Sequence, residues 1–131
     1  MHMIQIIALV FVVGVWSSAQ ATTIYVEKDG GGDFSVIQDA VDAAADGDVI
    51  MIGPGRFDDY TVDPQWGNFR LWLYGDKSLT FIGSGVDGTI IGPTSYGGNV
   101  HDWGIFSYPG QSTIRLEGIR FENLNRSGIT I

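Results

Sequence analysis

Short apolar runs separated by turn residues make up most of the chain after residue 22. The runs are bounded by Gly, Pro, Asn or Asp, a pattern that is typical of β-strands. Nineteen glycines fit a chain that turns this often. We expect a strand that begins at Thr23, and further strands at residues 49–52, 57–62, 71–74, 79–82, 89–91, 104–107, 113–116, 119–121 and 129–131.

One segment has the helical period instead of the strand period. Ser35 and Gln38 have the spacing of a capping box, which predicts that a helix begins at about Val36. Asp46 and Gly47 are expected to end the helix, because glycine readily adopts the left-handed conformation that closes one. The apolar positions that share one face of this helix are Val36, Ile37, Ala40, Val41 and Ala44.

The alternation of residues near the end of the chain favours strands wound into coils. Apolar and polar residues alternate on both sides of Gly118, and the phase shifts at that glycine, as a bend between two strands of one coil would require. Residues 79–83 and 114–118 look like two versions of one segment. Runs that end in glycine at such intervals are expected of a solenoid, although a sandwich or barrel also contains short strands.

The first part of the chain has the features of an export signal. An apolar run at residues 4–16 is followed by Ala19-Gln20-Ala21, an A-x-A cleavage pattern. A transmembrane anchor is the alternative, but a helix that spans a bilayer needs about 20 apolar residues. We therefore expect a signal peptide at residues 1–21 and one mature domain at residues 22–131. The protein is then secreted, and lies outside the cell, at the cell surface or in the periplasm.

Charge and cysteine content narrow the range of partners and ligands. The 131-residue chain has 15 acidic and 7 basic side chains, a formal net charge of −8, and no cysteine. An acidic protein repels nucleic acids, anionic lipids and polyuronates, so we expect no nucleic acid partner and no membrane partner after signal cleavage. Disulfides and thiolate metal sites are excluded. We expect no metal and no cofactor, and the oligomeric state is left open.

Six segments together resemble the secreted right-handed parallel β-helix proteins of the pectin-lyase-like superfamily. They are DGGGDFSVIQDAV at 29–41, GDVIMI at 47–52, PGRF at 54–57, LTFIGSG at 79–85, GTIIG at 88–92 and LEGIRFEN at 116–123. The resemblance implies an all-β fold, namely a right-handed single-stranded parallel β-helix (a solenoid) with a short amino-terminal capping α-helix over the open end of the coils.

Within this superfamily the opening is most similar to that of pectin methylesterases. Gly55-Arg56-Phe57-Asp58-Asp59 corresponds to their G-x-Y-x-E segment, with Phe in place of Tyr and Asp in place of Glu. No position matches the paired aspartates, the glutamine and the arginine that such esterases use, so no catalytic residue is assigned. The resemblance implies a fold and not an activity.

Residues 129–131 follow a strand pattern with no polar segment after them. A solenoid needs a terminal repeat with a polar outer face. We therefore expect residues 22–131 to be the amino-terminal cap and the first coils, about three to four of them, of a truncated domain.

Glycines and aspartates suggest ligand sites, but both have simpler explanations. Residues 30–32 are glycines between a strand and a helix, as in a dinucleotide-binding turn, but position 35 is serine and no repeated βαβ pattern follows, so we expect a tight turn.

Carboxylates bind calcium, but no calcium-loop motif is present, so solvated turn carboxylates are expected. As an acid/base pair, residues 58 and 59 would point to opposite faces of a strand. The aspartates are Asp29, Asp33, Asp58, Asp59 and Asp63.

A histidine and several aromatic residues complete the candidates. His101 beside Asp102 suggests a tuned base, but no nucleophile motif accompanies it, so a loop histidine is expected. Asn125-Arg126-Ser127 is a glycosylation sequon.

Aromatic residues in the polar stretches 63–70 and 92–103 suggest stacking on sugar rings, with packing onto the coils as the alternative. The aromatic set is Trp66, Phe69, Trp72, Tyr74, Tyr96, Trp103 and Tyr108.

Three functions agree with these observations. The first is a secreted or surface β-helix protein that is carbohydrate-directed, with polysaccharide binding lost on Trp66→Ala or Trp103→Ala. The second is the amino-terminal part of an enzyme of the pectin methylesterase or polysaccharide lyase type, whose catalytic coils lie outside this chain. The third is a structural or adhesive surface scaffold. No complete catalytic site is expected in this chain alone.

Overall fold

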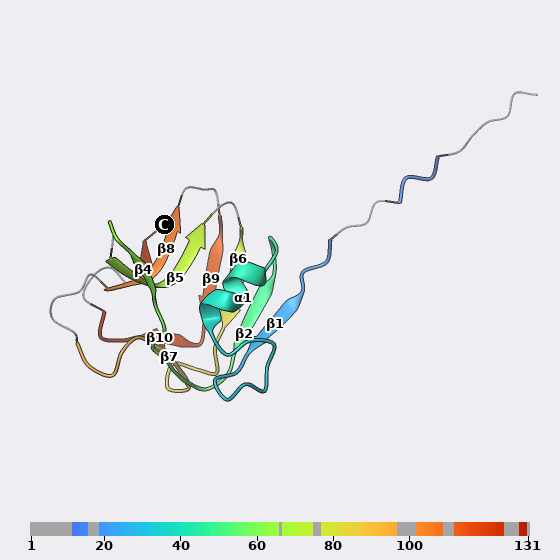
Figure 1. The fold of residues 1–131 in the computed structure, drawn as a ribbon. Coiled ribbons are helices and arrows are strands. Elements are labelled where there is room, and N and C mark those ends of the chain that lie inside the picture. The colour runs from blue at the N-terminus through green and yellow to red at the C-terminus, as the bar shows by residue number, and fades with distance from the viewer. Residues whose placement is uncertain are drawn as a thin grey trace, which may run out of the picture.

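A computed structural model describes residues 12–15, 19–65, 67–74, 77–96, 102–108, 112–124 and 129–130. Residues 12–15 and 19–22 are exposed, belong to no helix or strand, and run away from the folded part (Figure 1). Most of the apolar run at 4–16 lies outside the described residues, so the signal peptide stays a prediction. Among the described residues, the structure contains no helix of the length and hydropathy that crossing a bilayer requires.

The strands of the described residues form three sheets, which we name A, B and C. Sheet A has the order β1-β2-β6-β9, with β1 at Thr23–Val26, β2 at Val49–Ile52, β6 at Leu79–Ile82 and β9 at Ile114–Glu117. Sheet B has the order β3-β7-β10, with β3 at Gly55–Phe57, β7 at Thr89–Ile91 and β10 at Ile119–Phe121. Sheet C has the order β4-β5-β8-β11, with β4 at Thr61–Asp63, β5 at Gly67–Tyr74, β8 at Asp102–Tyr108 and β11 at Ile129–Thr130.

The strands visit the sheets in a fixed order. From β2 onward, the described strands pass from sheet A to B to C three times, and the last of these strands, β11, is in sheet C. All neighbouring strands are parallel except β4 and β5, which pair antiparallel. The early strands β1, β3 and β4 therefore lie at one end of their sheets, and β9, β10 and β11 lie at the other end.

The all-β prediction with one short helix is confirmed for the described residues. Strands β2, β6, β7 and β10 have the bounds that the sequence predicted. The predicted single strand at 57–62 is wrong, because residues 58–60 separate β3 from β4. The stretch at 63–70 is also not one polar loop, because β4 ends in it and β5 begins in it.

In-register pairing lines up apolar side chains from strand to strand and builds the core. In sheet A, Ile50 pairs with Phe81, which pairs with Leu116; Ile50 and Phe81 are fully buried. In sheet B, Phe57 pairs with Ile91 in the same way, and both are buried. Burial of such side chains is the main favourable term in folding. We call each line of paired apolar side chains a column, and these columns hold the three sheets together.

Gly118 lies at the bend between β9 of sheet A and β10 of sheet B, and its φ of +64° is in the left-handed region. The sequence predicted a bend between two strands at this position, and the bend is confirmed. A Cβ here would lie 3.0 Å from the carbonyl oxygen of Gly83, the residue that follows β6. Glycine is therefore required both for the backbone conformation and for the close approach.

The helix α1 spans Ile37–Ala43 and lies against β5, β1 and β2 (Figure 1). Four of the five residues of the predicted apolar stripe are buried, namely Ile37, Ala40, Val41 and Ala44. The fifth, Val36, is only partly buried and precedes the helix as its N-cap residue. The capping box is wrong, since Val36 is the N-cap residue and no side chain caps the helix.

The predicted end of the helix is also wrong. Ala44 is the C-cap residue and has an extended conformation. Gly47 has a φ of +86° but lies in a later turn, in which the Asp48 N–H donates to the carbonyl of Ala45 at 3.2 Å.

The glycines at 30–32 form the predicted tight turn between β1 and α1. Gly30 has a φ of +88°, and the Asp29 carboxylate accepts a hydrogen bond from the Gly31 N–H at 2.9 Å. The Asp33 carboxylate accepts one from the Tyr25 N–H at 2.8 Å. Both carboxylates therefore hold the local backbone, as expected of turn residues.

Arg56 on β3 ties together the ends of three strands of sheet B. Its Nη1 donates to the carbonyls of Gly92 at 3.1 Å and Pro93 at 2.8 Å, just after β7, and its Nη2 donates to the Glu122 carboxylate, just after β10. The Arg56 hydrogen bond lowers the pKa of Glu122 against the opposing effect of desolvation, and the charges of Arg56 and Arg120 lower it further. The ionised carboxylate is therefore the form that the fold favours.

Candidate functional site

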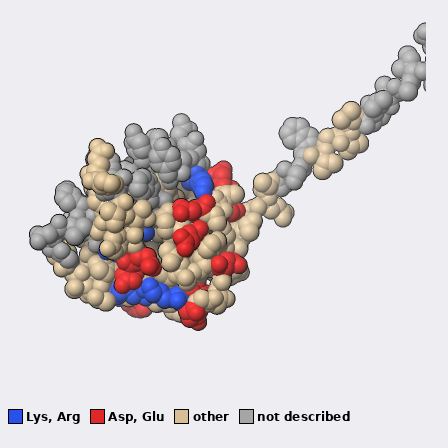
Figure 2. Space-filling view, in the orientation of Figure 1, with Lys and Arg blue, Asp and Glu red and all other residues tan. Residues whose placement is uncertain are grey.

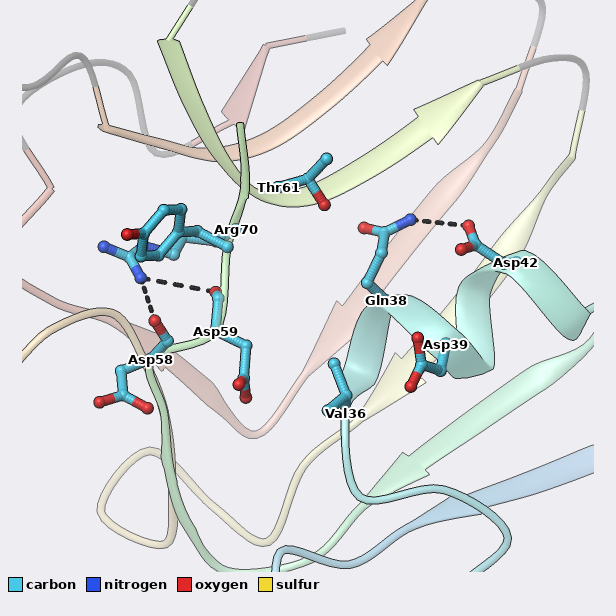
Figure 3. A pocket seen from close by; sticks show the side chains of 9 residues that line it. Val36, Gln38, Asp39, Asp42, Asp58, Asp59, Thr61 and Arg70 are labelled. Carbon is cyan, nitrogen blue, oxygen red and sulfur yellow. Dashed lines mark hydrogen bonds between the residues drawn. The ribbon is translucent and has the colours of Figure 1, made fainter. Parts of the chain in front are cut away.

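An open groove of about 560 Å³ lies between α1 and the segment that joins β3 to β4. One wall is the exposed side of the helix, the other is the segment at 58–61, and a residue of β5 lies behind that segment (Figure 3). The two walls are about twenty positions apart in the sequence, so only the fold brings them together. The lining residues are Val36, Gln38, Asp39, Asp42, Asp58, Asp59, Tyr60, Thr61 and Arg70.

Arg70 fixes the conformation of the segment wall. This side chain reaches from β5 and is only 6% exposed. Its Nη1 donates to the main-chain carbonyl of Asp58 and, at 3.4 Å, to that of Asp59 (Figure 3). Charge-assisted hydrogen bonds are stronger than neutral ones. Because the guanidinium holds the backbone, the carboxylates of both aspartates remain directed to solvent and to the groove.

Tyr60 supplies an aromatic surface at the groove. Its side chain is 54% exposed, and the Arg70 guanidinium lies 5.1 Å from the ring centroid. This cation–π contact uses one face of the ring and restricts its motion. The exposed part of the ring is therefore available to a ligand without much further loss of side-chain freedom.

The helix wall carries hydrogen-bonding groups. The Gln38 amide donates to the Asp42 carboxylate at 2.9 Å, one helical turn further on, and Asp39 is exposed beside them (Figure 3). At the end of the helix, Lys77 Nζ donates to the carbonyls of Val41 at 3.1 Å and Asp42 at 3.3 Å. Lys77 therefore satisfies main-chain acceptors that the helix end leaves free.

The floor of the groove is closed. Beneath it lies a cavity of only about 10 Å³, bordered by Ile37, Phe57 and Ile91 together with lining residues of the groove. A volume this small is at the lower limit for one water molecule. A ligand must therefore lie along the surface of the groove.

The groove is acidic. Among the described lining residues, Asp39, Asp42, Asp58 and Asp59 are acidic and Arg70 is cationic, and Lys28 lies beside the carboxylates of Asp58 and Asp59. Figure 2 shows acidic side chains gathered on the face that carries α1. Opposite charges attract and like charges repel, so the groove favours uncharged or cationic ligands over anionic ones. In the described part of the chain, no three potential metal ligands cluster together.

The structure corrects one expectation for Asp58 and Asp59. They are not on a strand, and both carboxylates lie near one ammonium group, with Lys28 Nζ at 3.4 Å from Asp58 and 3.8 Å from Asp59. The expectation of opposite faces of a strand therefore does not apply. The side chain of Asp63 lies outside the described residues.

The aromatic candidates are separated by the fold. Trp103 lies on β8, not in a loop, and its ring stacks on the fully buried Phe69 with centroids 6.3 Å apart. This contact supports packing and not sugar stacking for this pair. Tyr96 is 60% exposed and does not line the groove. Outside the described residues or side chains are Trp66, Trp72, Tyr74, His101, Asp102, Tyr108 and the sequon at 125–127.

Sequence reasoning missed the residues that define the groove. Tyr60 was left out of the aromatic candidates although it lies among aspartates, and that polar setting was the available signal. Arg70 gave no signal, because its partners are main-chain carbonyls that any residue supplies. Gln38 was assigned to a helix cap instead of the groove wall.

Comparisons with models of protein families, with curated proteins and with solved structures give no match to this chain. The resemblance to pectin-lyase-like proteins therefore stays a prediction from the sequence segments. The function has to be inferred from the groove itself.

Proposed function

We propose that the chain is an exported right-handed parallel β-helix with α1 at its amino-terminal end. The repeated passage of the chain through sheets A, B and C supports this fold, as do the parallel pairing and the aligned apolar columns. Right-handed crossovers are the general rule for parallel strands. Export rests on the apolar run at 4–16 and on the A-x-A pattern that follows it.

We infer that this protein binds a neutral polysaccharide in the groove between α1 and the 58–61 segment. The observation that carries the proposal is the combination of a held, half-exposed Tyr60 ring with carboxylate, amide and hydroxyl groups in one open groove. A sugar ring has an apolar face and a rim of hydroxyl groups. Aromatic rings are large apolar surfaces with specific geometry, and carboxylates accept several hydrogen bonds at once.

The shape and charge of the groove determine the kind of sugar. Because the floor is closed and the groove is open along the surface, it suits a chain that lies across it, with one residue against Tyr60. Because four carboxylates line it, polyuronates are repelled. The proposed ligand is therefore an uncharged polymer, such as a glucan, galactan or mannan, and not a pectate.

A binding assay with matched tyrosine variants tests this proposal. The full chain is titrated with neutral polysaccharides and with polygalacturonate, and the Tyr60→Ala and Tyr96→Ala variants are compared with it. Both tyrosines are about half exposed, but only Tyr60 lines the groove. We expect binding of a neutral polymer that Tyr60→Ala weakens roughly tenfold while Tyr96→Ala leaves it unchanged.

Two results would contradict the proposal. One is the absence of binding to every neutral polymer while polygalacturonate binds. The other is an equal effect of the two tyrosine variants, which would place the binding surface elsewhere. The Asp59→Asn variant removes one charge from the groove and keeps its shape. It should therefore weaken the repulsion of polygalacturonate and leave the binding of the neutral polymer unchanged.

A further inference from the structure

The carboxylate of Asp48 is buried and is held by two main-chain donors. The residue is only 5% exposed and comes directly before β2. One carboxylate oxygen accepts a hydrogen bond from the N–H of Ala45 at 2.8 Å, and the other accepts one from the N–H of Thr22 at 2.8 Å. Because both oxygens have a partner, the side chain cannot turn away from Thr22 without leaving a buried acceptor unsatisfied.

This carboxylate has no cation beside it in the described part of the chain. The ion pairs among the described residues all use other acidic groups, and Asp48 has no further interaction there. A buried carboxylate is usually paired with a positive charge, because the removal of an ionised group from water is costly. The burial of Asp48 therefore favours a positive charge at one of its two donors.

Thr22 is the residue at which the chain joins the fold. Its N–H donates to Asp48, its carbonyl accepts from the N–H of Val49 at 2.9 Å, and β1 begins at the next residue. Residues 19–21, which carry the A-x-A pattern, are exposed and run away from the folded part (Figure 1). The bond that this pattern predicts to be cleaved, between Ala21 and Thr22, is therefore accessible to a peptidase.

We propose that cleavage of the export signal creates an ion pair between the new amino terminus at Thr22 and the carboxylate of Asp48. The ion pair rests on the proposed export of the chain. Hydrolysis of the Ala21–Thr22 bond places the OH of water on the carbonyl carbon of Ala21 and its H on the nitrogen of Thr22. The proton that the new carboxyl group releases then converts the amine into an ammonium group, which is the main form at neutral pH because the ordinary pKa of an α-amino group is about 7.7–8.0.

The existing hydrogen bond already has the geometry of this ion pair. The 2.8 Å between the Thr22 nitrogen and the Asp48 oxygen is a normal distance for a charge-assisted hydrogen bond. Thr22 is exposed, so the remaining N–H groups of the ammonium stay in water and the cost of desolvating it is small. Cleavage thus places a positive charge beside a buried negative one without moving the chain. The domain therefore reaches its full stability only after the signal is removed.

The position of cleavage is the first test. The full chain is expressed in a host with a general secretory pathway, and the amino terminus of the released protein is determined by intact mass and amino-terminal sequencing. We expect Thr22 to be the first residue. A released protein that begins at another residue would overturn the ion pair but not the export, whereas an uncleaved chain that stays inside the cell would contradict both.

The stability of the released protein is the second test. It is compared in urea with a form, cut from a fusion protein, that retains Gln20 and Ala21, so that the nitrogen of Thr22 is still an amide. We expect a roughly tenfold smaller unfolding constant for the released protein, because a hydrogen bond to a charged donor is stronger than one to a neutral donor. The urea midpoint should then be higher by about 0.5–1 M. Equal midpoints for the two forms would overturn the proposal.

Two substitutions show whether the carboxylate is responsible. Asp48→Asn keeps an acceptor but removes the charge, and it should abolish the difference between the two forms. Asp46→Asn is the matched control, because it removes the same charge two residues away, where the carboxylate accepts from the Ser78 N–H at 2.7 Å. It should leave the difference unchanged. A difference that survives Asp48→Asn, or that Asp46→Asn abolishes equally, would overturn the proposal.

Acetylation of the amino terminus tests the ion pair without any substitution, and so does not depend on the folding of a variant. An acetyl group on the Thr22 nitrogen keeps one N–H donor and removes the charge. The acetylated protein should have the lower urea midpoint of the form that retains Gln20 and Ala21. An acetylated protein as stable as the released one would show that the ammonium charge contributes nothing.

Discussion

Replacing Arg70 by methionine should destabilise the fold and loosen the wall of the groove. Methionine keeps much of the apolar stem but removes the guanidinium, so the carbonyls of Asp58 and Asp59 lose their donor and Tyr60 loses its cation–π partner. A hydrogen bond to a charged group contributes about 1.5–3 kcal/mol. The Asp59 contact is long, at 3.4 Å, and both aspartates are exposed enough for water to replace the donor. We therefore expect a loss of about 2–3 kcal/mol in the free energy of unfolding.

Urea unfolding followed by tryptophan fluorescence measures this loss. A fall of this size lowers the midpoint by about 1–2 M, since the denaturant dependence for small domains is about 1–3 kcal/mol per molar urea. Lys28→Met is the matched control, because Lys28 contacts the same two aspartates, but through their exposed carboxylates. Exposed ion pairs contribute about 0–1 kcal/mol. If the two variants lose equal stability, Arg70 does not hold the segment as described.

Three further changes test the core, a bend and the ion pair of sheet B. Phe81→Ala removes the fully buried centre of the sheet A column and should lower the stability by about 3–5 kcal/mol in the same urea assay; a loss below about 1 kcal/mol would contradict the strand register. Gly118→Ala forces a residue with a Cβ into a φ of +64°, and a loss of about 1–2 kcal/mol in the free energy of unfolding is expected. Glu122→Gln removes a carboxylate whose pKa Arg56 lowers, so the stabilisation lost is present above the ordinary carboxyl pKa of about 4.3 and disappears as the pH falls through the lower folded value. Unfolding midpoints measured from about pH 7 to pH 3 should therefore converge for the wild type and this variant in acid, and a constant difference would show that the charge is not responsible.

The sequence correctly predicted those elements whose start and end depend only on residues nearby in the chain. The strands β2, β6, β7 and β10 are apolar runs with turn residues beside them, and their bounds were correct. The stripe of α1 was correct at four of its five positions for the same reason, since the 3.6-residue period reports which face is buried. In both cases the signal lies within a few residues of the element that it describes.

The errors occur where distant residues decide the local conformation. The capping-box pattern of Ser35 and Gln38 has the right spacing, but Gln38 bonds to Asp42 on the helix instead. The run at 57–62 has the composition of a strand, but residues 58–60 belong to no strand. The Arg70 side chain of β5 instead donates hydrogen bonds to the main-chain carbonyls of Asp58 and Asp59. Such contacts carry no pattern within a window of sequence, so the groove was not predictable from the sequence alone.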